Sequence, residues 1–366
     1  MAGVIEGRIH PWLARFGVDR RTLRRGIATL SSGWAGRVAP DAHEAGLEIL
    51  AEWVCWAFVV DDQYIDSGPG ASRPDLFNPM AARMLACLAN PEAPVLDGSP
   101  FSAALADLSQ RLRAIAPPAL IQPWIQAHYM WLFGSGCSVS DRSTGAVRGL
   151  DEHLLIGPLD RAEPVTTFMI QMVEGTTLPA RELDRAEVRA ITDAAHVLET
   201  CYNDIASYRH ELYQGCLESN LVHVLHIERG GSAQDAMNAA VALVERIMRL
   251  FLALCEQIEP TASPELRRYM AQLRHKVRGN SDWQRTVPRY TVHLDIAPDD
   301  IVGTPDRDLS IPAATPLYVY TDTPSDAPLT APAAAITWWW DLLDRTGTGR
   351  RPPRTTIGHP TRRTPR

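Results

Sequence analysis

The chain has 366 residues, a formal net charge of −7 and an apolar content of 45%. This length is enough for one large domain or two ordinary ones, each with a hydrophobic core. The acidic balance argues against nucleic acid as the main partner. No apolar run reaches the roughly 18 residues that a membrane span needs, and the N-terminus lacks the apolar centre of a signal peptide. We therefore expect a cytoplasmic protein without a membrane span.

The cysteines and the single lysine exclude further classes. The six cysteines are scattered without a C-x-x-C pair, so we expect reduced core thiols rather than disulfides or a zinc site. Lys276, the only lysine, lies in the basic run Arg274–Arg278 and outside any glycine loop, so there is no P-loop. A Schiff-base mechanism would depend on this residue, which its basic neighbours place outside an apolar pocket.

Apolar residues at three- and four-residue spacing predict an almost wholly helical domain from about residue 19 to 290. The clearest helical windows are 41–60, 100–115, 119–133, 183–201, 214–229, 233–257 and 264–278. Glycine and proline clusters predict breaks at 67–70, 117–118, 134–136, 157–158 and 230–231. With no strand–turn–strand series and no G-x-G-x-x-G motif, we predict an all-α fold class.

The composition changes after about residue 297. Residues 298–366 are rich in Pro, Thr and Arg, so we assign a folded domain to 1–297 and a mostly disordered tail to 298–366. The tail contains three consecutive tryptophans at 338–340, a short segment for which docking on the domain is an alternative.

Three aspartates follow a strongly apolar and aromatic run. Asp61 and Asp62 come directly after residues 53–60, and Asp66 precedes a Ser-Gly-Pro-Gly stop. Burial and like charge both oppose the ionisation of adjacent carboxylates, and the helix dipole disfavours negative charge in the last turns. A divalent cation relieves both penalties; Asp62 and Asp66, four residues apart, share a helix face, with Asp61 adjacent. The alternative is a surface helix end with three solvated acids.

Asn203, Ser207 and Glu211 recur every four residues between apolar flanks. On a helix each is turned only about 40° from the last, which predicts one column of amide, hydroxyl and carboxylate oxygens. Such hard ligands suit Mg²⁺. The alternative is a chance pattern on a polar stripe.

Arg289 and Tyr290 follow Pro288 at the end of the last helical region. One interpretation is a surface loop. The other is a bidentate phosphate ligand, Arg289, with the Tyr290 hydroxyl beside it.

These three elements, in this order, resemble those of the bacterial class I terpene synthases, or terpene cyclases. The aspartate-rich motif, the Asn/Ser/Glu metal triad and the terminal Arg-Tyr pair of that family are similar to residues 61–66, 203–211 and 289–290. The separations also fit, with 142 residues from Asp61 to Asn203 and 86 from Asn203 to Arg289. The resemblance covers about residues 10–295 and leaves the tail unexplained.

The resemblance implies the class I terpenoid synthase fold, an antiparallel helical bundle around a deep apolar pocket, with 1–297 as the catalytic domain. Two motifs would face each other at the mouth and hold three Mg²⁺ ions through Asp61, Asp62, Asp66, Asn203, Ser207 and Glu211. The implied substrate is a linear prenyl diphosphate, and the catalytic residues are Asp61, Asp62, Arg289 and Tyr290.

The implied enzyme is a carbon–oxygen lyase acting on phosphates. Farnesyl diphosphate is the default substrate, ionised and cyclised to a sesquiterpene with release of diphosphate. Geranylgeranyl diphosphate, giving a diterpene, is the alternative, because motif spacing does not report pocket depth.

A carbocation needs a water-free pocket whose lining stabilises it without reacting, as aromatic faces do. The candidates, for each of which core packing is the alternative, are Trp53, Trp56, Phe58, Trp131, Phe133, Phe168 and Trp283. We prefer Phe58 and Trp283 as substrate contacts because they flank the motifs.

Two positions depart from the family pattern. The expected diphosphate-sensing arginine falls on Gly157, with Asp160 on the linker and Arg161 on the effector position. Either the register is shifted and Arg161 senses the diphosphate, which we favour, or the sensor is lost. The basic residue before the triad glutamate is His210, with Arg209 preceding it. We expect both to contact the substrate, although a histidine is only partly charged near neutral pH.

Other interpretations stay open. A chain-elongating prenyltransferase would show two aspartate-rich motifs, whereas this chain has one. A non-catalytic isoprenoid-binding paralogue is suggested by Gly157 and the tail. The motifs leave the oligomeric state undecided, and a homodimer is one option.

Overall fold

The computed structural model describes residues 2–66, 68–95, 98–291 and 332–343, and within these ranges the chain is helical without a strand. This confirms the predicted all-α class. The elements are α1 (Ala2–Ala14), α2 (Arg20–Ile27), α3 (Ser31–Val38), α4 (Glu44–Val60), η1 (Asp61–Asp66), α5 (Pro74–Ala89), α6 (Pro100–Ile115), α7 (Pro118–Thr144), α8 (Leu150–Asp160), α9 (Glu163–Val173), α10 (Ala180–Leu183), α11 (Ala186–Gln214), α12 (Leu221–Arg229), α13 (Ala233–Ile258), η2 (Glu259–Thr261), α14 (Pro264–Gln284), α15 (Pro288–Thr291), η4 (Ala334–Ile336) and α16 (Thr337–Leu343).

Several helices begin at side chains that satisfy the free amides of a first turn. Ser232 and Asp235 form a reciprocal capping box at the start of α13. The Ser263 hydroxyl accepts from the Leu266 amide at the start of α14, where Pro264 supplies a fixed φ. Local sequence therefore determines where these helices start.

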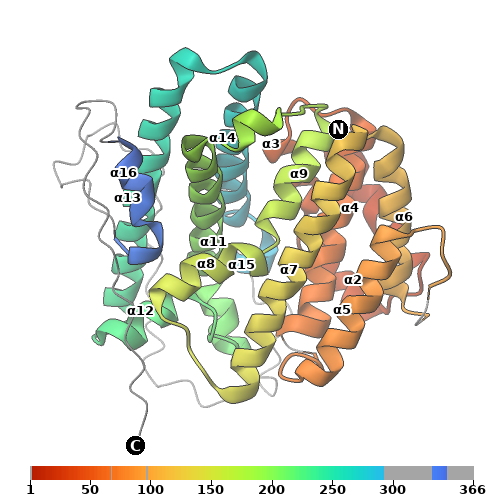
Figure 1. The fold of residues 1–366 in the computed structure, drawn as a ribbon. Helices are drawn as coiled ribbons and strands as arrows, with labels where there is room; N and C mark the ends of the chain where they lie inside the picture. Colours follow the sequence, from red (N-terminus) through yellow and green to blue (C-terminus); the bar gives the residue numbers. More distant parts are fainter. Residues whose placement is uncertain (1, 67, 96–97, 292–331, 344–366) are drawn as a thin grey trace, which may run out of the picture.

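The described residues form two hydrophobic cores, one on each side of the molecule. The first joins α1–α7 and α9 with the C-terminal end of α14, and the second joins α8, α11–α13 and the rest of α14 with α16. Figure 1 shows the N-terminal helices, red to orange, apart from the green and cyan helices α11–α13. Helix α14 contributes to both cores, and together with α4, α9 and α11 it lines the site described below.

Two predicted breaks are wrong, because their glycines are contact points between helices. Helix α7 runs unbroken through residues 134–136, and α8 runs through 157–158. A Cβ atom on Gly134 would lie 2.8 Å from the Leu159 Cβ, and one on Gly157 would lie 2.9 Å from the Thr200 Cγ2. Both glycines thus let α8 pack closely, against α7 and against α11.

The true break in this region follows Asp160. Arg161 ends α8, Ala162 adopts a left-handed conformation with φ of 56°, and α9 starts at Glu163 with Pro164 in its first turn. A left-handed φ is uncommon for alanine and marks a conformation imposed by the surrounding structure. Four consecutive residues at this break, 160–163, line the cavity inside the bundle.

A short piece of the predicted tail is helical. Residues 334–343 form η4 and α16, and α16 lies beside α13 (Figure 1). The side chains of Trp339 and Trp340 are buried against the second core. The Asp151 carboxylate on α8 accepts from the Ala335 amide at 2.8 Å. The rest of the predicted tail and the end of the predicted domain lie outside the described residues. Within the described ranges, no helix combines the length and hydropathy that crossing a membrane requires.

Candidate active site

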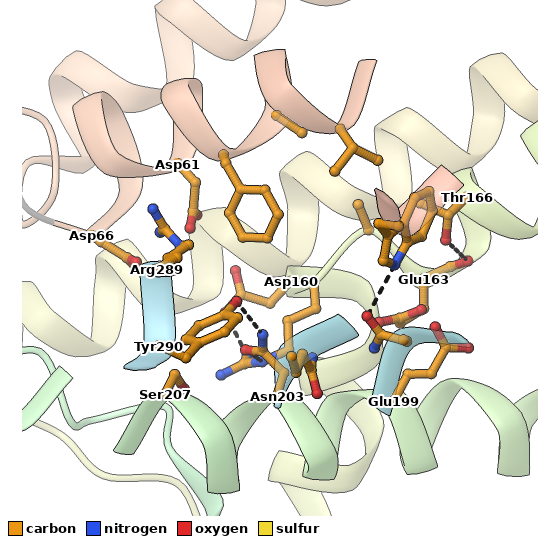
Figure 2. Close-up of a pocket in the computed structure, with 18 of the residues that line it drawn as sticks. Asp61, Asp66, Asp160, Glu163, Thr166, Glu199, Asn203, Ser207, Arg289 and Tyr290 are labelled. Carbon is orange, nitrogen blue, oxygen red and sulfur yellow. Dashed lines mark hydrogen bonds and ion pairs between the residues drawn. The ribbon is translucent and has the colours of Figure 1, made fainter. Parts of the chain in front are cut away.

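A cavity lies between the two cores (Figure 2), and its volume is about 1040 Å³ when the solvent at its open mouth is included. It is bounded by α3, α4, η1, α7, the α8–α9 break, α11, α14 and α15. Its lining includes the aromatic residues Trp34, Trp53, Phe58, Trp131, Trp283 and Tyr290, and the acidic residues Asp61, Asp66, Asp160, Glu163, Glu199 and Glu211.

The aspartate motif forms a π-helical turn, Asp61–Asp66, at the end of α4. In a π-helix the backbone hydrogen bonds span five residues rather than four, so side chains are rotated relative to those of an α-helix. This brings Asp61 and Asp66 into the lining of the cavity, whereas Asp62 does not line it. Asp62, which α-helical spacing pairs with Asp66, is turned toward Arg289 in this π-helical turn.

The three aspartates crowd negative charge. One carboxylate oxygen from each can be grouped within 4.8 Å of the others. Burial, followed by the charges of Asp66 and Asp62, raises the pKa of Asp61 well above its usual range. Such a cluster of oxygens matches the ligand preference of a hard divalent cation.

Asp62 has a different partner. Its two carboxylate oxygens accept from the Arg289 guanidinium at 2.7 and 3.0 Å, and both side chains are less than one-tenth exposed. Although burial alone would raise it, the charge and hydrogen bonds of Arg289 hold the pKa of Asp62 below its usual value. The Arg289 guanidinium also lies 4.6 Å from the Phe58 ring centroid. Arg289 thus joins α15 to the aspartate motif.

Asn203, Ser207 and Glu211 share one face of α11 and line the same cavity as Asp61 and Asp66. The Ser207 hydroxyl donates to one Glu211 oxygen at 2.6 Å, and the Asn220 amide donates to the other at 2.8 Å. Burial raises the pKa of Glu211 to about 7. The structure thus brings the two predicted metal motifs together across one cavity.

Asn203 links two further predicted residues. Its amide nitrogen donates to the Tyr290 hydroxyl at 2.9 Å, and its oxygen accepts from Arg161 at 3.3 Å (Figure 2). Burial raises the pKa of Tyr290 to about 12, so its hydroxyl stays protonated. Tyr290 and Arg161 therefore lie beside the Asn203 end of the column.

Asp204, a residue that the sequence analysis did not single out, holds Arg161 in place through an ion pair. Its carboxylate is fully buried and is paired with both Arg161 and His153. Although burial opposes ionisation, these partners keep the pKa of Asp204 below its usual value. The arginine thus reaches the cavity from the α8–α9 break, while Gly157 lies in close contact with Thr200.

His210 and Arg209 differ in placement. His210 lines the cavity, and its charge contributes to lowering the pKa of Asp62. Arg209 is exposed and is not part of the lining. An α-helix turns about 200° over two residues, so position 209 faces away from 207 and 211. The structure does not support substrate contact by Arg209.

Of the aromatic residues predicted to line the pocket, some line the cavity and others do not. Phe58 and Trp283 line the cavity with ring centroids 5.8 Å apart, and Trp53 and Trp131 line it too. Three candidates lie elsewhere: Trp56 is buried and donates to the Phe101 carbonyl, Phe133 is 63% exposed, and Phe168 borders a separate cavity. Trp34, which lies on α3 outside the motifs, was missed.

Lys276 does not line the cavity but is buried beside it, despite its basic neighbours in the sequence. This side chain is 1% exposed and pairs with Glu163 and Glu199, two residues of the cavity lining that the sequence analysis did not single out. Glu199 stands four residues before Asn203, so the column spacing was the one available signal for it.

The fold and the site define a helical-bundle protein with oxygen-rich motifs facing an aromatic cavity. Residues 52–250 match the family described as "Terpene synthase family 2, C-terminal metal binding", which is more than half of the chain. Spiroviolene synthase from Streptomyces violens is 32% identical over 318 residues, covering 86% of this chain and 84% of that protein. The chain belongs to the terpene synthase family, and the resemblance seen in its motifs is confirmed.

Other relatives agree with this assignment. Bonnadiene synthase from Allokutzneria albata is 32% identical over 92% of this chain and 93% of that protein. A variant of the SVS_A2 protein from ancestral sequence reconstruction superposes with a TM-score of 0.79 at 32% identity, covering 93% of this chain and 95% of that one. The α-eudesmol synthase structure, at 21% identity and a TM-score of 0.70, shares the fold.

Proposed function

We propose that this terpene synthase ionises a linear prenyl diphosphate with the help of Mg²⁺, cyclises the carbocation and releases diphosphate, as a carbon–oxygen lyase. The observation that carries the proposal is the convergence of Asp61 and Asp66 with the Asn203 column on one aromatic cavity. Oxygen ligands on one side and aromatic rings on the other suit a substrate with an anionic head and an apolar chain.

Farnesyl diphosphate is the proposed substrate, with a sesquiterpene as product. The support is a relative from Streptomyces clavuligerus named "(+)-T-muurolol synthase ((2E,6E)-farnesyl diphosphate cyclizing)". It is 30% identical over 84% of this chain and 70% of that protein. Geranylgeranyl diphosphate is the alternative substrate, to be decided by experiment.

The residues present fit a divalent metal, because the carboxylates of the π-helical turn are crowded and partly buried. We propose that Asp61, Asp66, Asn203, Ser207 and Glu211 hold Mg²⁺, with three ions expected from the family pattern. Bound Mg²⁺ neutralises negative charge on the diphosphate as it departs. Asp62 instead fixes Arg289 through its two carboxylate oxygens.

The chain's own donors would bind the diphosphate. Arg289, Tyr290 and Arg161 present guanidinium and hydroxyl groups within the lining, and His210 adds a titratable ring. Such donors stabilise charge that grows on the leaving group. The apolar chain would lie against Phe58, Trp283 and their aromatic neighbours, whose faces attract a cation and exclude water.

The test is incubation of the purified chain with Mg²⁺ and, separately, geranyl, farnesyl and geranylgeranyl diphosphate. Gas chromatography–mass spectrometry of an organic overlay identifies products, and a coupled assay measures released diphosphate. We expect a cyclic product from farnesyl diphosphate that disappears when Mg²⁺ is chelated. Products from geranylgeranyl diphosphate alone would contradict the proposed chain length.

If protein shown to be folded by circular dichroism forms no product and releases no diphosphate with any of the three substrates, the enzyme assignment is contradicted. Binding of a prenyl diphosphate without release would then identify an isoprenoid-binding paralogue.

A further inference from the structure

A buried ionic cluster forms part of the cavity wall away from the aspartate motif. The Lys276 ammonium lies 2.5 Å from a Glu163 oxygen and 2.9 Å from a Glu199 oxygen. The exposed fractions of Lys276, Glu163 and Glu199 are 1%, 6% and 1%. The two glutamates line the cavity, whereas the lysine lies behind them.

Glu199 extends the column of proposed metal ligands on α11 by about one helical turn toward the start of the helix. It precedes Asn203 by four residues on α11, so at 1.5 Å per residue it lies about 6 Å beyond Asn203 and about 18 Å from Glu211 along the axis. Figure 2 shows Glu163 and Glu199 on the opposite side of the cavity from Asp61, Asp66 and Arg289. The acidic lining thus has two separate parts, one at each end.

The cluster has an unbalanced charge in apolar surroundings. Two carboxylates and one ammonium group carry a formal charge of −1 when all are ionised, and Trp34, Trp53 and Trp283 line the same cavity. Burial, and then the charge of Glu163, raise the pKa of Glu199 well above its usual range. The Lys276 ammonium favours the ionised form of Glu199, and in that form the buried carboxylate binds a proton more strongly than a solvated one.

We propose that the Glu199 carboxylate accepts the proton whose loss ends the cyclisation. This inference rests on the proposed function. The C–H bond next to the cationic carbon breaks, its electron pair becomes the new carbon–carbon double bond, and the proton bonds to a Glu199 oxygen. The electron pair of the broken C–O bond has already left with the diphosphate. After product release, Glu199 returns its proton to water.

The other acidic residues of the lining are less suited to this step. Asp61, Asp66, Asp160 and Glu211 lie near the metal motifs, where the diphosphate would bind. Glu163 has the shorter contact with Lys276 and so the more compensated charge. Glu163 and Lys276 are therefore positioning residues, which hold the Glu199 carboxylate against the cavity.

The test compares Glu199→Gln with wild type by product distribution, diphosphate release and melting temperature. We expect the share of the main product to fall about tenfold or more, replaced by other double-bond isomers or alcohols. Diphosphate release should fall by a smaller factor, because ionisation takes place at the other end of the cavity. Glu199→Asp, which keeps a carboxylate, should restore part of the main product.

Asp193→Asn is the matched control, since it makes the same chemical change on α11 at an exposed position outside the lining. Its product distribution should equal that of wild type. If Glu199→Gln does not fold, the uncharged variant Glu163→Gln/Glu199→Gln/Lys276→Met preserves volume and leaves no buried charge unpaired. The same shift in products is expected from it.

An unchanged product distribution in a folded, active Glu199→Gln or triple variant overturns the proposal. Proportional losses of diphosphate release and of every product, together with a lower melting temperature, also overturn it, because they indicate a structural role. Absence of product from the wild-type chain contradicts the proposed function instead, so the two failures are distinguishable.

Discussion

Asp62 and Arg289, 227 residues apart in the sequence, form a two-point ion pair beside the cavity. The pair connects the π-helical turn after α4 to the short helix α15. It fixes the guanidinium next to the Phe58 ring and leaves Asp61 and Asp66 as the two aspartates of this motif that line the cavity. This ion pair therefore holds the aspartate motif and the Arg-Tyr pair next to each other.

Replacing Arg289 by lysine keeps the positive charge and loses the planar two-point contact. We expect diphosphate release to fall about 100-fold, the scale for losing one preorganised donor. Asp62 keeps a charged partner but loses one of its two charge-assisted hydrogen bonds, about 1.5–3 kcal/mol, so the melting temperature should fall too. Steady-state kinetics and thermal unfolding check both effects.

Arg73→Lys is the control for this prediction, since it makes the same replacement at an ion pair whose side chains are 56% and 60% exposed. Such pairs contribute little to stability. Equal behaviour of the two variants would show that the two-point contact has no role.

Asn203→Ala tests the metal column. The substitution removes one proposed oxygen ligand of the metal and the hydrogen bond to Tyr290, which is 2.9 Å long. We expect Mg²⁺ with diphosphate to raise the melting temperature of wild type and to have little effect on the variant, because ligands stabilise the state that binds them. Asn238→Ala, at an exposed position on α13, should respond like wild type. A wild-type response from Asn203→Ala would contradict the metal assignment.

Gly157→Ala tests why no arginine stands at the expected sensor position. The added Cβ would lie 2.9 Å from the Thr200 Cγ2, so α8 and α11 must separate. We expect a loss of about 1–3 kcal/mol in the free energy of unfolding. Thr200→Ser removes that methyl group and keeps the hydroxyl that donates to the His196 carbonyl. Denaturant unfolding should therefore show the double variant recovering most of the loss, and no recovery would place the strain elsewhere.

The motifs were predictable because their signals are local. The column of Asn203, Ser207 and Glu211 follows from helical periodicity alone, and the structure places it as expected. The aspartate motif was found for the same reason, but the pairing of its Asp62 with Arg289 was not. A π-helical turn rotates the side chains relative to an α-helix, and nothing in the local spacing of Asp61, Asp62 and Asp66 announces that turn.

The environment of Lys276 could not be predicted in this way. Its flanking basic residues suggest a solvated helix, yet its partners Glu163 and Glu199 come from α9 and α11. At Gly157 the sequence predicted a break where the structure has a continuous helix. A glycine–proline pair normally marks a helix end, but here the glycine leaves space for the neighbouring helix α11. Tertiary packing decides both cases.

His128 predicts a pH dependence of stability. Its ring accepts from the Trp53 indole at 3.1 Å and contacts the Trp124 carbonyl at 3.0 Å, and burial lowers its pKa to about 4. Below pH 6.5 the His128 ring of the unfolded chain takes up a proton, whereas the buried ring of the folded chain stays neutral down to about pH 4. The free energy of unfolding is therefore highest above pH 6.5 and falls as the pH decreases from 6.5 to about 4. The loss is about 1.4 kcal/mol per pH unit down to about pH 4.

The measurement is the free energy of unfolding of wild type and His128→Gln from pH 7.5 to 5. The variant should be less stable at pH 7.5, since it loses ring packing, and the difference should shrink by about 2 kcal/mol at pH 5. Parallel curves would show that His128 does not titrate differently in the two states.

The docked segment 332–343 predicts that part of the C-terminal region stabilises the domain. Trp339 is 2% exposed against the second core, whereas its neighbour Trp338 is 37% exposed. Trp339→Ala should cost about 3–5 kcal/mol, as expected for truncating a large buried side chain. Trp338→Ala, the same change at the exposed position, should cost much less. Thermal unfolding of both full-length variants measures the difference, and equal melting temperatures would show that α16 does not hold its place on α13 in solution.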